Sequence, residues 1–176
     1  MFLAHGYEST TVDQIAAAAG MSKRTFFRYL ASKENLVIGK YDFLGDRMAE
    51  VLAQRPDDEP VWLSLRRVFD LTVAYVQNEQ ERIRSDAMER IMQSTPALNA
   101  GYLDKLSRMQ ALLVDGVRQR LGPREADGTG PDPRPAAIVG AAFACLLAAR
   151  TTWLASDQAR PFAELLDESM AALSLG

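Results

Sequence analysis

The sequence predicts an all-α fold, in which a small N-terminal unit of short helices precedes a larger helical domain. Apolar residues recur at helical spacing along the chain, and helix caps accompany them, whereas the strict alternation typical of strands is almost absent. Hydrophobic residues make up 48% of the 176 residues, which is enough for a packed core. Stretches rich in Pro and Gly separate the predicted helices.

The first two predicted helices are short and well capped. Thr11 and Gln14 form the capping box of a helix that ends at Gly20. Ser22 caps the next helix, which we expect to end near Leu30. Two short helices joined by a tight turn are typical of a helix-turn-helix.

Longer helices are predicted for the rest of the chain. Ser32 caps a helix that we expect to run to about Gln54, and two loops, 55–60 and 122–135, interrupt the pattern that follows. The remaining helices are expected over residues 60–76, 79–93, 96–121, 135–156 and 161–173.

Composition argues against several classes of protein. The net charge is -3, so nucleic-acid binding would need a local basic patch. A single cysteine, Cys145, cannot form an internal disulfide, which favours a cytoplasmic protein. The first ten residues lack a basic stretch followed by a long apolar run, so we expect no signal peptide. Neither Cys145 nor the single histidine, His5, has the partners of a catalytic site, and a phosphate-binding glycine loop is missing. A solvated linker is favoured over a cation site for the acidic run 57–59, so we predict no enzyme activity, cofactor or metal.

The run from Ala136 to Ala149 holds fourteen uncharged residues and could be mistaken for a membrane span. A spanning helix needs about 20 apolar residues, and Arg150 closes this run. We therefore expect a helix buried on all sides of a protein that does not enter a membrane.

The helix at 22–30 divides into two faces of opposite character. Residues 22–40 hold five basic side chains against one acidic side chain. On a helix of 3.6 residues per turn, Phe26 and Leu30 share an inner face, on which Ile15 and Ala16 can pack. The outer and flanking positions are Lys23, Arg24, Thr25, Phe27, Arg28 and Tyr29. Such a helix fits the major groove of double-stranded DNA, with Lys33 near phosphate, although a solvated charged face is the alternative.

The stretch GYESTTVDQIAAAAGMSKRTFFRYLASKENL resembles the DNA-binding domain of the TetR family of bacterial transcriptional regulators. The resemblance covers residues 1–47 and leaves 48–176 as a ligand-binding and dimerisation domain. It implies a homodimeric repressor that a small molecule releases from a near-palindromic operator. By position in the motif, the DNA-facing residues are Thr11, Lys23, Thr25, Phe27, Arg28 and Lys33. Phe27 stands where many members carry a tyrosine that bonds a phosphate.

The start of the chain departs from this family. The letters MFLAHGY match only the end of the family's first helix, so that helix is expected to be incomplete. The alternative hypothesis is therefore a helical small-molecule-binding or interaction module that has lost DNA binding through N-terminal truncation.

Residues 48–176 yield two further hypotheses. A pocket for an apolar or aromatic effector could be lined by Met88, Met92, Tyr102, Met109, Phe143 and Trp153, although such residues also build ordinary cores. The last two helices are expected to pair with those of a second copy in a four-helix bundle, because one chain cannot cover every apolar side. The interface is assigned to Gly140, Ala141, Ala144, Ala148, Phe162, Leu165 and Leu166.

Overall fold

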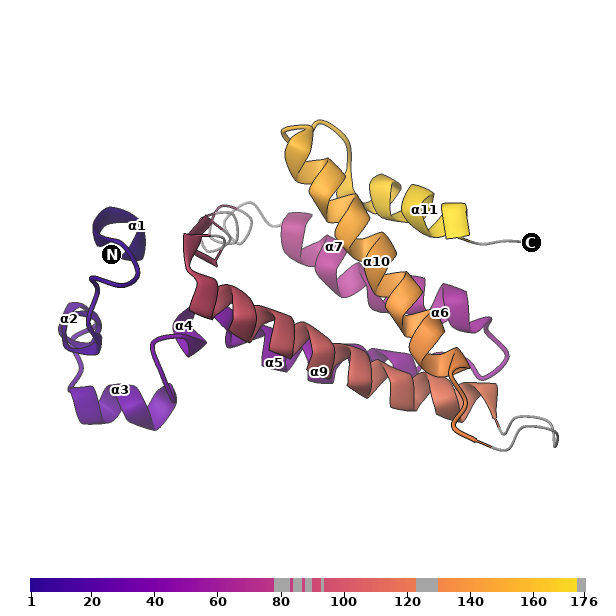
Figure 1. Cartoon of the computed structure of the whole chain (residues 1–176), viewed down its shortest axis with the longest axis horizontal. Coiled ribbons are helices and arrows are strands. Elements are labelled where there is room, and N and C mark those ends of the chain that lie inside the picture. The colour runs from indigo at the N-terminus through magenta and orange to yellow at the C-terminus, as the bar shows by residue number, and fades with distance from the viewer. Residues whose placement is uncertain (78–82, 84–86, 88–89, 93, 123–129, 174–176) are drawn as a thin grey trace. The chain divides into compact units, whose positions relative to one another are not determined.

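The computed structural model describes residues 1–77, 83, 87, 90–92, 94–122 and 130–173. Within these ranges every regular element is a helix, which confirms the predicted fold class (Figure 1). The chain forms two compact units. Unit 1 contains Met1–Phe43 and Glu79–Leu106, and unit 2 contains Leu44–Asn78 and Ser107–Gly176. Each compact unit draws on two stretches of the chain, and the predicted division at residue 47 stays a prediction.

Unit 1 begins with four short helices, α1 (Phe2–His5), α2 (Val12–Ala18), α3 (Lys23–Tyr29) and α4 (Asn35–Ile38). The caps predicted for α2 and α3 are confirmed, whereas Glu34 and not Ser32 is the N-cap of α4. The backbone N–H of Gln14 donates to Thr11 Oγ1 over 3.2 Å, and the N–H of Thr11 donates to Gln14 Oε1 over 2.8 Å. Gly20 takes a φ of 66°, the left-handed conformation that lets the chain turn directly into α3. Ser22 Oγ then accepts from the N–H of Thr25 over 3.1 Å.

The helix predicted over residues 32–54 is divided at Gly39. Its first part is α4, and its second part is α5 (Lys40–Ala53). A Cβ atom at position 39 would lie 2.4 Å from the carbonyl oxygen of Asn35. The tight turn between α4 and α5 therefore requires glycine, and the periodicity of the flanking residues does not reveal it.

The first part of α9 (Pro96–Leu121) contributes to the core of unit 1. The Tyr102 ring lies 4.8 Å from the Tyr41 ring, and Lys105 Nζ lies 2.5 Å from a carboxylate oxygen of Asp42. A Cβ atom at Gly101 would lie 2.9 Å from Ile38 Cδ1, so backbone and side chain meet closely there. These contacts fix α4 and the first turn of α5 against α9.

Unit 2 contains α6 (Val61–Val68), α7 (Asp70–Gln77), α10 (Arg134–Ala155) and α11 (Phe162–Leu173). α10 packs against α11 and α6, and α11 also contacts α7 (Figure 1). The single helix predicted over 60–76 is divided at Phe69, whose φ of -72° and ψ of -8° end α6. The buried Phe69 ring meets the Phe143 ring edge to face at 5.5 Å, so the break lies in the core.

Within its own chain, helix α10 is buried on one side only, which differs from the expected burial on all sides. Eight of its side chains are buried, Trp153 among them. Ala144, Leu147 and Ala148 are exposed. By length and composition, α10 is the one helix among the described residues that could cross a membrane. Its packing against α11 and α6 accounts for the apolar character of its buried side.

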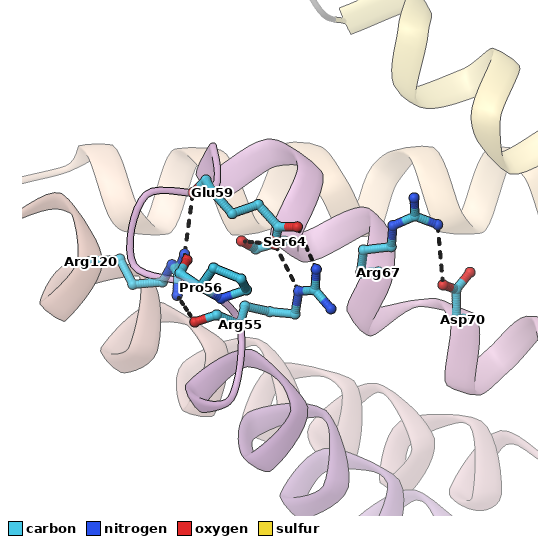
Figure 2. Close-up of polar contacts among 7 residues, drawn as sticks. All are labelled: Arg55, Pro56, Glu59, Ser64, Arg67, Asp70 and Arg120. Atoms are coloured by element: carbon cyan, nitrogen blue, oxygen red, sulfur yellow. Dashed lines mark hydrogen bonds and ion pairs between the residues drawn. The ribbon is translucent and has the colours of Figure 1, made fainter.

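An arginine from the end of α9 holds the predicted linker 55–60 in unit 2 (Figure 2). The Arg120 guanidinium donates to the carbonyl oxygens of Arg55 over 3.0 Å and Glu59 over 3.2 Å, and also to that of Pro56. The Glu59 carboxylate accepts from Arg55 Nε over 2.8 Å and from Ser64 Oγ over 2.7 Å. These two bonds lower the pKa of Glu59 to about 2, and the bond from Arg55 has the larger effect. The linker is therefore a bonded element of the fold.

Candidate nucleic-acid interface

Helix α3 packs against α2, and it carries one fully buried phenyl ring. The Phe26 side chain is 1% exposed, and Ala16 of α2 is buried as well. Phe27 meets the Phe26 ring edge to face at 5.4 Å. The buried Phe26 confirms its predicted place on the inner face, whereas Leu30 ends α3 as an extended C-cap and is half-buried.

The outward side of α3 combines cations with exposed rings. Arg24 and Arg28 are exposed, Phe27 is 48% exposed, and Tyr29 is 70% exposed. The Arg28 guanidinium carbon lies 4.9 Å from the centre of the Tyr29 ring, and Arg28 donates to Tyr29 Oη over 3.3 Å. The side chains that face solvent here can offer guanidinium donors and aromatic surface to one ligand.

Three predicted contact residues already have partners within the chain. Lys23 Nζ lies 3.1 Å from a carboxylate oxygen of Asp13 on α2. Thr11 Oγ1 is engaged in its capping box, and Thr25 Oγ1 lies 2.9 Å from Ser22 Oγ. These three side chains therefore support the geometry of α2 and α3, and a ligand that used them would compete with these bonds.

The Lys33 side chain, expected near phosphate, is directed to the backbone of its own chain. Its ammonium donates to the carbonyl oxygen of Tyr7 over 2.9 Å and to that of Thr10 over 3.1 Å. It also lies 4.2 Å from the centre of the Tyr7 ring. The sequence reasoning missed this cluster, because its members lie more than twenty positions apart and no local pattern joins them.

Tyr7 and Glu34 complete that cluster. Tyr7 Oη donates to Glu34 Oε1 over 3.0 Å. Burial first, and then the bond to Glu34, raises the pKa of the Tyr7 phenol. Hydrogen bonds from the Ser32 side chain and from the backbone N–H of Glu34 itself lower the pKa of Glu34. Glu34 therefore remains a carboxylate that accepts a hydrogen bond from the neutral Tyr7 phenol.

Comparison with known families agrees with these features. A family model described as bacterial regulatory proteins, tetR family, matches residues 1–38, and a model described as MftR C-terminal domain matches residues 59–176. The chain belongs to the TetR family. The first match contains α2 and α3, and therefore the whole helix-turn-helix.

Two relatives of this TetR-family chain are transcriptional regulators. TcmR of Streptomyces glaucescens is 34% identical over 143 residues, which are 79% of this chain and 62% of TcmR. The chain thus spans less than two thirds of that relative. The mycofactocin biosynthesis regulator MftR of Mycobacterium tuberculosis is 27% identical over 178 residues, covering 100% of this chain and 85% of MftR.

Solved structures share the fold of this TetR-family chain. A TetR-family regulator from Mesorhizobium loti has a TM-score of 0.58 at 23% identity, over 97% of this chain and 86% of that chain. FadR from Bacillus subtilis, in complex with stearoyl-CoA, has a TM-score of 0.61 at 20% identity, over 99% and 92%. At these identities the likeness concerns the fold alone.

The predicted effector-binding residues of this TetR-family chain do not form one cluster in either unit. Met92 and Tyr102 belong to unit 1, and Met109, Phe143 and Trp153 belong to unit 2. Met88 lies outside the described residues. Met92, Met109, Phe143 and Trp153 are buried. In the part of the chain that the structure describes, no group of His, Cys, Asp or Glu could hold a metal ion.

The residues predicted for the dimer interface fall into two classes. Phe162, Leu165 and Leu166 are buried within their own chain, so they offer no surface to a second copy and their assignment to the interface needs correction. They face inward because α11 packs against α10 and α7. Ala144 and Ala148 are exposed on α10, while Gly140 and Ala141 are partly exposed.

Proposed function

We propose that this chain is a homodimeric transcription repressor of the cytoplasm that binds double-stranded DNA through α3. It acts by binding and not by catalysis, without a cofactor. Its operator is near-palindromic, because a two-fold dimer presents two copies of α3 to two half-sites. A small apolar or aromatic effector releases the protein from this operator.

The observation that supports this proposal most strongly is the outward side of α3. Arg24 and Arg28 present guanidinium groups, which read guanine edges in the major groove. Phe27 and Tyr29 are exposed beside them, and Phe27 can meet a thymine methyl group or a sugar. Phe26 is buried on the opposite side of α3, so these groups are presented from a helix that is packed into the core.

The dimer would use the exposed side of α10. Ala144, Leu147 and Ala148 are exposed there, and Ala141 is partly exposed one turn earlier. Small side chains allow two helices to approach closely. We place the effector in the helical region after residue 47, whose core contains Met109, Phe143 and Trp153.

Selection from a randomised pool of DNA duplexes tests the DNA-binding proposal. The wild-type chain should enrich one near-palindromic sequence, and Arg24→Ala with Arg28→Ala should abolish the enrichment while the far-ultraviolet circular dichroism stays unchanged. A wild-type chain that enriches no sequence, and binds no duplex at low salt, would favour a helical binding module without a DNA-binding role.

A further inference from the structure

The Lys33 ammonium uses most of its donors inside the protein. A lysine has three N–H donors and no acceptor. Two of those donors are directed to the carbonyl oxygens of Tyr7, at 2.9 Å, and Thr10, at 3.1 Å. The position of the charge 4.2 Å from the Tyr7 ring centre adds a cation–π contact. A phosphate would have to share or replace these partners.

The acceptors are themselves held in place. Thr10 is 1% exposed, and its Oγ1 donates to the carbonyl oxygen of Gly6 over 2.6 Å. Tyr7 is buried, and its Oη donates to Glu34, the residue that follows Lys33. The segment 6–10 and the residues 33–34 are therefore joined by side-chain bonds in both directions.

The position of this junction in the chain gives it a structural consequence. Thr10 directly precedes Thr11, the N-cap of α2, and Lys33 follows α3 and precedes α4. The bond between Lys33 and the Thr10 carbonyl spans 23 positions, and both helices of the helix-turn-helix lie between its ends. The chain is thus closed at the base of the α2–α3 pair.

We infer that Lys33 is a positioning residue for α3 and not a phosphate ligand. It closes the segment that carries α2 and α3, and thereby fixes the orientation in which Arg24 and Arg28 are presented. This inference rests on the proposed DNA-binding function. It differs from the sequence-based expectation, because loss of a phosphate ligand makes the salt dependence of binding shallower, whereas loss of a positioning residue leaves it unchanged.

The test compares the full chain with Lys33→Met, Lys33→Arg and the control Arg24→Met. Two quantities are measured: amide hydrogen exchange of residues 12–30 in the free protein, and the slope of log affinity against log salt for the duplex that the wild type selects. Arg24→Met removes an exposed cation of α3 and should leave the exchange unchanged.

Lys33→Met should speed exchange in α2 and α3 and lower affinity by about tenfold to a hundredfold, which corresponds to the loss of bonds from one charged donor. The salt slope should stay as in the wild type. Lys33→Arg, which keeps the charge and several donors, should restore most of the protection. Complete loss of protection in Lys33→Met would also support the inference, since it would show that α2 and α3 depend on this side chain.

Unchanged exchange in Lys33→Met would overturn the inference. If the salt slope also became shallower by about 0.9 per bound chain, Lys33 would be a phosphate ligand. The exchange measurement needs no DNA. A wild type that binds no duplex would therefore refute the proposed function, while the role of Lys33 in holding α2 and α3 would still be decided.

Discussion

The ammonium of Lys23 lies 3.1 Å from a carboxylate oxygen of Asp13, so that an acidic side chain of α2 holds a cation of α3. Both side chains are more than half exposed, and such pairs contribute about 0–1 kcal/mol to stability. The pair matters more for binding. In the proposed complex, Asp13 would compete with phosphate for Lys23, and its own charge would repel the DNA backbone.

Asp13→Asn should therefore strengthen DNA binding. We expect a gain of up to about fivefold, the equivalent of one exposed ion pair, together with little change in stability. Fluorescence anisotropy with the selected duplex measures it. Glu50→Gln is the matched control, because Glu50 forms an exposed ion pair with Arg47 at 2.7 Å in unit 2. Weaker binding by Asp13→Asn would show that the pair organises α3 for its ligand.

Arg28→Ala should weaken binding by about 1–3 kcal/mol and relax base preference at one position of each half-site. The reason is that Arg28 is exposed on α3 and has the donor geometry that reads guanine. Affinities for single-base variants of the selected duplex provide the measurement. Tyr29→Phe keeps the ring beneath the guanidinium and removes the oxygen that accepts from Arg28. A loss in Arg28→Ala that is equal for every base variant would assign Arg28 to the DNA backbone.

Phe26→Ala should unfold α2 and α3 locally. Removal of a fully buried phenyl costs about 3–5 kcal/mol, which is comparable with the stability of a small domain. Amide exchange of residues 12–30 should become fast, while exchange in α10 and α11 should not change. Phe27→Ala provides the control, since Phe27 is half exposed and its loss should affect stability far less. Retained protection in Phe26→Ala would contradict the anchoring role of Phe26.

Leu147→Glu should convert the proposed dimer to a monomer, as measured by light scattering. Leu147 is 40% exposed on the side of α10 that Ala144 and Ala148 share, so a carboxylate there would be buried by a second copy. Leu63→Glu on α6 is matched in exposure at 41% and should leave the mass unchanged. A Leu147→Glu chain with the mass of a dimer would place the interface elsewhere.

Glu59 should contribute to the stability of unit 2 above pH 4.5, its ordinary pKa, and this contribution should be lost as the pH falls toward about 2. The sign follows because the folded protein binds the proton more weakly than the unfolded chain does. Urea unfolding should show a steeper fall in the free energy of unfolding for the wild type than for Glu59→Gln over this interval. Ser64→Ala removes the second cause of the shift and should give an intermediate dependence. Parallel curves would contradict the assignment.

The sequence allowed the local features of the fold to be predicted, because caps and turns depend on neighbouring residues. Thr11, Gln14 and Ser22 take the capping roles expected of them. The break at Phe69 escaped prediction, because helical spacing continues across it and one change in ψ leaves the apolar stripe intact. Leu165 was expected at an interface for a related reason. Periodicity shows that a face is apolar, but not whether it packs on its own chain or on another.

The same distinction between local and distant information applies to the site. The period of the α-helix determines which side chains of α3 face outward, so Arg24 and Arg28 could be placed from the sequence. The partners of Lys33 could not, because carbonyl oxygens occur at every position and leave no mark in the sequence. Bonds between a side chain and a distant backbone group become visible only in the folded chain.

The hydrogen bonds from Arg120 to the linker have a consequence for which positions of this chain can change in evolution. Arg120 contacts the carbonyl oxygens of Arg55, Pro56 and Glu59, which any amino acid would supply in the same place (Figure 2). The exposed positions 56–58 can therefore drift over generations without loss of this contact. A single substitution at Arg120 would remove all three bonds at once. Retention of the linker conformation therefore depends on Arg120, a residue that lies outside the linker.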